Sequence, residues 1–125
     1  MKIEFSNGDI VDRYTIVSIK KEKIQDGEKR KNVHCEHEIL EQALVELSIL
    51  QDHPLCTRLK EVNERLWEIE DQIRVKEQKK EFDNEFIQLA RSVYITNDKR
   101  ASLKREINVL TESFLVEEKH YQDYK

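Results

Sequence analysis

The sequence predicts an all-α fold, a long antiparallel helical hairpin or helix bundle with a short extended N-terminal arm. Composition is the first reason, because 38% of the 125 residues are charged and the chain holds only two glycines and one proline, as in solvent-exposed helices. Apolar residues repeated at steps of three and four are the second reason. Capping residues ahead of these repeats are the third. The length suits one helical domain over 1–125.

The N-terminal region allows two interpretations. "MKIEF" alternates apolar and charged residues, but the later chain offers no strand partner, so we expect an extended arm over 1–7. In "SNGD", Asn-Gly favours a hairpin turn, whereas Ser6 followed by Asp9 forms a capping box that begins a helix. Helical spacing of the next apolar residues favours a helix over 8–25. The β-branched content of "DIVDRYTIVSI" keeps a hairpin as the alternative.

Two more helices are predicted in the middle of the chain. Gly27 suits the C-terminal cap of the first helix, and a second helix follows over 28–51. "QDHPL" marks the next boundary, where Pro54 fits the first position of a third helix over 54–79. That helix carries a coiled-coil-like apolar seam, formed by Leu55, Leu59, Val62, Leu66, Ile69 and Ile73.

The last predicted helix, 84–118, has a polar interruption. At about 100° per residue, the apolar direction of Phe86 continues into Asn97, Arg100 and Lys104, while later apolar residues form a stripe displaced by roughly 90°. The helix therefore either breaks near Asn97 or stays straight and exchanges packing partners.

A straight helix of this length also favours assembly. It would be about 50 Å long, whereas a compact domain of this size is about 35 Å across. Together with the unpaired arm, this predicts a homo-oligomer, a dimer or larger.

An antiparallel hairpin of the last two helices brings polar residues of both together, pairing position 100 with 63 and position 97 with 67. The resulting set combines an indole, a phenol, amides, a carboxylate and cations: Asn63, Trp67, Glu70, Tyr94, Asn97, Arg100 and Lys104. Such a set can bind a small polar or anionic ligand by stacking and charge-assisted hydrogen bonds. It can equally be a polar layer that fixes register and partner choice with no ligand.

The function we predict is therefore a non-catalytic oligomeric helical binding or assembly module. The alternative is a small-ligand site, or a small enzyme, at the polar layer. A comparison with helical chorismate mutases supports the enzyme only weakly, because their spaced pattern on the first helix is missing here. The chain also has only two glycines, too few for a Gly-rich loop that binds phosphate.

The sequence gives only weak signals for metal or nuclease chemistry. One cluster has metal-ligand residue types, namely His34, Cys35, His37, Glu38 and Glu41, but no second ligand group completes it. "EEKH" gives a single Glu-x-x-His where a di-iron bundle needs two. Arg30 and His37 have the spacing of the HEPN ribonuclease motif, which arises often by chance on a charged helix. We predict no metal, no cofactor and no catalytic residue.

Charge and hydropathy limit the partners. The net charge is −4 with the signs interspersed, so no basic face predicts nucleic-acid binding. No apolar run approaches the roughly 20 residues that cross a bilayer. Two cysteines without a CxxC spacing and an N-terminus without a secretory signal predict a cytoplasmic protein with no membrane partner.

Four stretches carry a family resemblance: "NGDIVDRYTIVSIKKEKI", "VNERLWEIEDQIR", "FIQLARSVYITNDKRASLKREIN" and "LVEEKHY". Together they resemble the DUF6165 family of small bacterial and phage proteins over nearly the whole chain. The resemblance implies an all-helical protein and no established activity. The same stretches contain most of the polar set, from Asn63 to Arg100.

Overall fold

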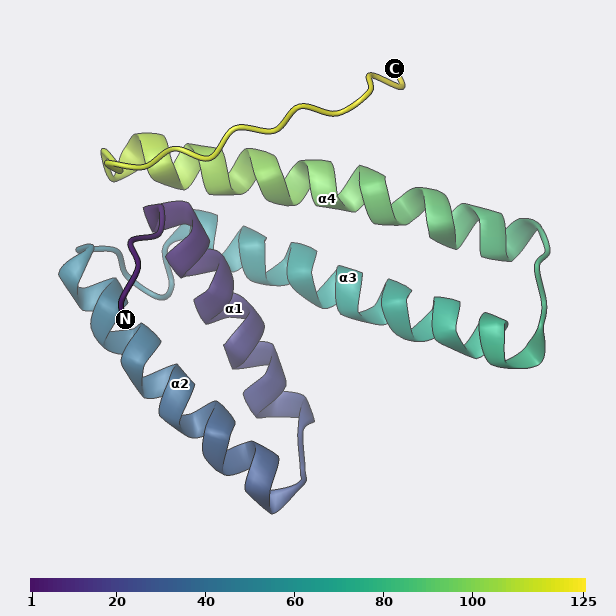
Figure 1. Cartoon of the computed structure of the whole chain (residues 1–125), viewed down its shortest axis with the longest axis horizontal. Coiled ribbons are helices and arrows are strands. Elements are labelled where there is room, and N and C mark those ends of the chain that lie inside the picture. The colour runs from purple at the N-terminus through teal and green to yellow at the C-terminus, as the bar shows by residue number, and fades with distance from the viewer.

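The computed structural model describes all 125 residues, and it contains four α-helices and no strand. The helices are α1 (Asn7–Lys23), α2 (Gly27–Glu46), α3 (Pro54–Lys79) and α4 (Asn84–Leu110). The all-α prediction is confirmed. Figure 1 shows two helical hairpins, α1–α2 and α3–α4, which meet at one end and diverge, so that the far half of α3–α4 extends beyond the other two helices.

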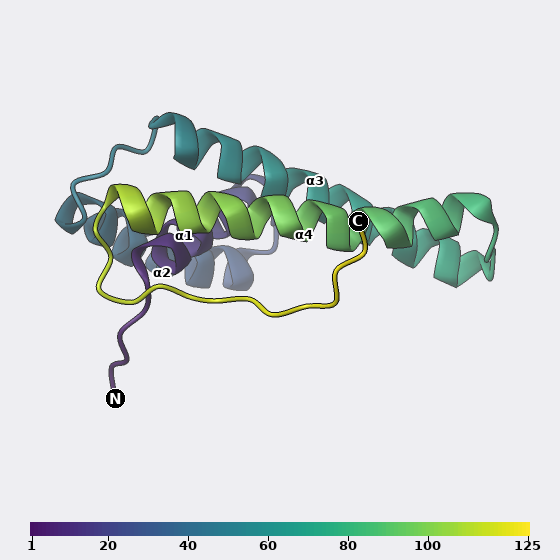
Figure 2. The ribbon, with the colours of Figure 1, turned by 90° about the horizontal axis from the view of Figure 1, so that it is seen from above.

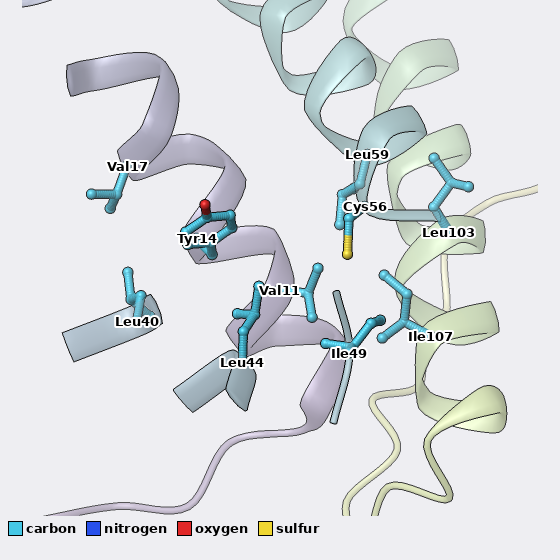
Figure 3. Close-up of a cluster of buried hydrophobic side chains, with 10 residues drawn as sticks. All are labelled: Val11, Tyr14, Val17, Leu40, Leu44, Ile49, Cys56, Leu59, Leu103 and Ile107. Carbon is cyan, nitrogen blue, oxygen red and sulfur yellow. The ribbon is translucent and has the colours of Figure 1, made fainter. Parts of the chain in front are cut away.

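The core lies where the two hairpins meet. α1 packs against each of the other three helices, whereas α2 packs only against α1. Val11, Leu59 and Ile107, from α1, α3 and α4, are fully buried at the centre of a ten-residue cluster (Figure 3). α1 is thus the helix that joins the two hairpins.

Each helix begins at a side-chain cap. The Oγ of Ser6 accepts from the N–H of Asp9, so Ser6 caps the helix as predicted, and the alternative of a β-hairpin in this region is wrong. Asp26, His53 and Asp83 cap the other three helices in the same way. The capping box at Ser6 is incomplete, because the carboxylate of Asp9 accepts from the hydroxyl of Ser6 and not from its backbone N–H. Gly27, expected as a C-terminal cap, is instead the first residue of α2, because Asp26 begins a new helix at once.

Three helices end earlier than predicted: α1 by two residues, at Lys23, and α2 and α4 by more. α2 ends at Glu46 and not near residue 51, since Ser48 adopts a left-handed conformation with φ of 56°. α4 ends at Leu110, eight residues before 118. There Glu112 is left-handed, and the hydroxyls of Thr111 and Ser113 accept hydrogen bonds from Asn7 at the start of α1. The chain then turns back, and its last residues run beside α4 (Figure 2).

α4 is continuous through Asn97, so the helix is not broken there. Its first half packs on α3, and its second half also reaches α1. The polar interruption therefore marks an exchange of partners within one chain, and the new partner is α1. This exchange explains the polar stripe but not the length of the hairpin, whose far half extends beyond α1 and α2 (Figure 1), so assembly with a second copy of the chain stays a prediction. No helix is both long enough and apolar enough to span a membrane.

Candidate functional site

The polar stripe of α4 pairs with the N-terminal half of α1. The backbone N–H of Gly8 donates to the Oδ1 of Asn108 over 2.6 Å, and the Nζ of Lys104 lies 2.7 Å from an oxygen of Asp9. One turn further, Arg100 meets Asp12. The two helices run antiparallel along this seam, so successive turns of α1 meet earlier turns of α4.

Asp12 is the centre of this polar layer. Its Oδ1 accepts from Nε of Arg100 at 2.9 Å and from Nδ2 of Asn63 at 2.9 Å, and its Oδ2 accepts from Nη2 of Arg100 at 2.6 Å. Asn63 also donates to Thr15, 2.8 Å away. No buried side-chain polar atom lacks a partner. Such a saturated layer ties α1, α3 and α4 together, and the bonds to Asp12 raise the pKa of Arg100.

A cleft of about 410 Å³ opens beside this layer, between α1, α3 and α4. It contains five of the seven predicted site residues, Asn63, Trp67, Glu70, Asn97 and Arg100. The hairpin pairing holds in outline, since the residues expected to face each other line one space. Arg100 and Asn63, however, meet through Asp12 instead of contacting each other directly.

The charges in the cleft balance. Its lining carries two carboxylates, Glu70 and Asp71, and two guanidinium groups, Arg74 and Arg100. Arg74 is paired with Glu70 at 2.6 Å, and Arg100 is bound to Asp12. The Nζ of Lys23 lies 5.9 Å from the ring centre of Trp67, a cation–π distance. The polar groups of the lining that have no hydrogen-bond partner include the carboxylate of Asp71, the amide of Asn97 and the indole N–H of Trp67.

The remaining two predicted residues lie elsewhere. Tyr94 and Lys104 line a second cavity, of about 920 Å³, between α4 and the C-terminal segment 113–125. Asn97 and Arg100 border both cavities. The predicted residues are therefore divided between two neighbouring cavities.

Asp12, which is 5% exposed, was not predicted as a site residue from the sequence. The local sequence of α1 does not distinguish Asp12 from acidic residues on the protein surface. A usable signal was present: Gly8, Asp9 and Asp12 form a stripe whose spacing complements Arg100, Lys104 and Asn108. The cleft residues Ile16 and Ile19 were also missed, because the helical hairpin predicted from the sequence left out α1.

Three of the candidate metal and nuclease residues, Arg30, His37 and Glu41, make contacts within the fold. The guanidinium of Arg30 donates to backbone carbonyls of Lys21 and Ile24 at the end of α1. The Nδ1 of His37 lies 3.0 Å from a carboxylate oxygen of Glu41, and its Nε2 lies 3.3 Å from the hydroxyl oxygen of Ser18.

A serine, histidine and carboxylate in this order resemble a hydrolase triad. Ser18, however, also donates to the carbonyl of Tyr14 within α1. Its neighbouring backbone N–H groups lie inside a continuous helix, where they bond to carbonyls of the preceding turn and cannot stabilise an oxyanion. The three side chains thus connect α1 to α2.

Comparison with protein families gives one match, which covers residues 1–124. The chain belongs to the DUF6165 family, a family of unknown function. A search of curated proteins and a search of solved structures found no match. For this DUF6165 protein, any assignment of function therefore has to come from its own site geometry.

Proposed function

We propose that this DUF6165 protein is a non-catalytic helical binding module, and that its site is the cleft beside Trp67. The supporting observation is that five residues predicted from the sequence border one cleft, and that one of them, Arg100, is fixed by its ion pair with Asp12. Sites of this size combine an apolar or aromatic surface with a few oriented polar groups. In this cleft the apolar and aromatic surface comes from Ile16, Leu66 and Trp67. The polar groups are those of Asn97 and Asp71.

The balance of charge decides the ligand class. Because two carboxylates face two guanidinium groups, and both guanidinium groups are already paired, a simple anion gains little there. A small polar ligand that is neutral or carries both charges fits better. Its planar or cationic part stacks on Trp67 in place of Lys23, and its donors and acceptors meet Asn97 and Asp71.

A binding role fits the cleft better than a catalytic one. General acid–base catalysis needs uncommitted titratable groups close to the reacting atoms. Glu70 is held by Arg74, so Asp71 is the one uncommitted carboxylate in the lining.

The free cysteines, exposed Cys35 and buried Cys56, fit the reducing cytoplasm that we propose as the place of action.

Tryptophan fluorescence tests the proposal directly, because Trp67 is the only tryptophan in the chain. The protein is titrated with amino acids, nucleosides and small sugars while emission and melting temperature are followed. A ligand should shift both, since binding to the folded state stabilises it. Asn97→Ala should weaken binding, whereas Gln78→Ala, distant in the hairpin, should not. A flat response to every class would contradict the proposal.

Self-association is a second candidate function. At the tip of the α3–α4 hairpin, Phe82 is 57% exposed and Ile87 is 49% exposed. Phe82 also packs edge-to-face on Phe86, with ring centres 5.2 Å apart. We propose that this hairpin tip, residues Phe82, Phe86 and Ile87, contacts a second copy of the chain, because clustered exposed aromatics are typical of interfaces.

Light scattering coupled to gel filtration separates the two candidates. If the hairpin tip associates, the wild-type mass should exceed that of one chain, and Phe82→Glu should return it to a monomer. Phe114→Glu is the matched control, because Phe114 is 86% exposed at the other end of α4. A wild-type monomer at all concentrations rules out association but leaves the Trp67 cleft untouched.

A further inference from the structure

The cavity between α4 and the C-terminal segment differs in charge from the Trp67 cleft. Its lining contains four cations, Arg100, Lys104, Lys119 and Lys125, and one carboxylate, that of Asp98. Two of the cations, Arg100 and Lys104, also pair with Asp12 and Asp9 of α1, whereas Lys119 and Lys125 have no acidic partner on the helices. Lys104 is largely shielded from solvent, with a side chain 13% exposed. A cavity with an excess of positive charge at partly buried positions attracts anions.

One carboxylate of the C-terminal segment already lies among these cations. Glu117 is 3.1 Å from the Nζ of Lys104 and 2.6 Å from the Nζ of Lys119. Hydrogen bonds from these two lysines lower the pKa of Glu117 to about 2. The position between the two ammonium groups therefore has a clear preference for negative charge.

The segment that carries Glu117 is held by side chains alone. Beyond Ser113 it makes no backbone–backbone hydrogen bond. Its attachments to α4 are Lys104–Glu117, Arg105–Glu118, the bond from Tyr124 to Asp98 and the packing of Tyr124 on Tyr94. Arg105–Glu118 is an exposed ion pair, and such pairs contribute about 0–1 kcal/mol. Glu117 is itself 36% exposed, so the segment can be displaced without unfolding a helix.

Aromatic rings complete the cavity. Tyr94 and Tyr124 meet edge-to-face with ring centres 5.0 Å apart, and Tyr121 lines the same wall. Tyrosine rings offer flat apolar surfaces with a polar edge, which suits the rings of sugars and nucleosides. Cations beside such rings fit a ligand with an oxyanion at one end and a ring at the other.

We propose that this cavity binds the phosphate ester of a ring-shaped group, and that Glu117 is a built-in competitor which the phosphate displaces from Lys104 and Lys119. A phosphate carries more negative charge than a carboxylate and has three acceptor oxygens, so it can bond to both lysines at once. The site is distinct from the Trp67 cleft, although Asn97 and Arg100 border both.

Calorimetric titration of the full chain with inorganic phosphate and with phenyl phosphate, at constant ionic strength, tests the proposal. Glu117→Gln should tighten binding of both probes by about threefold or more, because a competitor for the site is removed. Glu118→Gln is the matched control: it removes the neighbouring carboxylate, which pairs with Arg105 outside the cavity. It should change binding by less than about twofold. Phenyl phosphate should bind more tightly than inorganic phosphate.

The two variants distinguish displacement from a general charge effect. Equal tightening by Glu117→Gln and Glu118→Gln would overturn the proposal, as would no binding by any variant. Lys119→Gln is an independent test. It should weaken binding of both probes, and it should leave the helices intact because Lys119 lies beyond the end of α4. Binding seen only in Glu117→Gln supports the proposal, because the competitor is then strong enough to hide the site in the wild type. None of these outcomes depends on Trp67.

Discussion

The backbone N–H of Gly8 and the side-chain carbonyl of Asn108 are joined by a hydrogen bond of 2.6 Å, which brings the first turn of α1 against the last turns of α4. The approach is so close that a Cβ built on Gly8 would lie 2.4 Å from the backbone oxygen of Lys104. Glycine at this position therefore permits the contact between the two hairpins, and not any special backbone angle, since no glycine has positive φ.

Gly8→Ala should destabilise the protein by about 1–3 kcal/mol, as expected for overpacking against atoms that cannot move aside. Gly27→Ala is the matched control, because nothing lies within 4 Å of a Cβ there. That change should leave stability equal or raise it by up to about 1 kcal/mol, since alanine restricts the unfolded chain. Urea denaturation of both variants measures the difference, and equal effects would contradict the close contact.

His37 predicts a pH dependence of stability. Burial, together with the charge of Lys21, lowers its pKa below the ordinary value, against the opposing effect of Glu41. The unfolded chain therefore takes up this proton first as the pH falls below about 6.5. The contribution of His37 to the unfolding free energy is complete above that pH and is lost on acidification.

His37→Gln should flatten the change in unfolding free energy between about pH 7.5 and about pH 5.5. His34→Gln is the control, because His34 is exposed on the same helix. Denaturation curves at both pH values provide the measurement. A slope that responds to His34 and not to His37 would show that the buried imidazole has no such role.

Asn63→Asp tests the polar layer through charge. The amide of Asn63 donates to Asp12 at 2.9 Å, so the variant places two carboxylates side by side. The unfolding free energy at pH 7 should fall by about 2 kcal/mol or more. It should partly recover at lower pH, because one carboxyl of the pair holds a proton in the folded state. Asn97→Asp, at an exposed position, should stay within about 0.5 kcal/mol of wild type.

Much of this fold could be predicted from local pattern. The apolar seam of α3 and the capping residues Ser6 and Asp83 are short-range signals. In the structure the seam lies along one helix, and Ser6 and Asp83 are the N-caps of α1 and α4. The change of face in α4 was also visible in the sequence, since a helix rotates by a fixed angle per residue. Its cause, contact with α1, was not.

The parts that sequence reasoning missed depend on long-range pairing. Asp12 is 88 positions from Arg100, and no local rule connects them. The end of α4 was placed too late for the same reason: Thr111 and Ser113 bind Asn7, more than 100 positions away. Helical spacing predicts which side chains share a face. It does not predict which helix covers that face.

The most direct test of this account is a double-mutant cycle between Asp12 and Arg100, because this pair both joins the hairpins and fixes one wall of the Trp67 cleft. Unfolding free energies are measured for wild type, Asp12→Asn, Arg100→Gln and the double variant. Each single change should cost about 2 kcal/mol or more, since it leaves a partly buried charge without its partner, and the coupling energy should be at least about 1.5 kcal/mol. Additive losses, with a coupling below about 0.5 kcal/mol, would contradict the assignment of Asp12 as the residue that holds Arg100 in place.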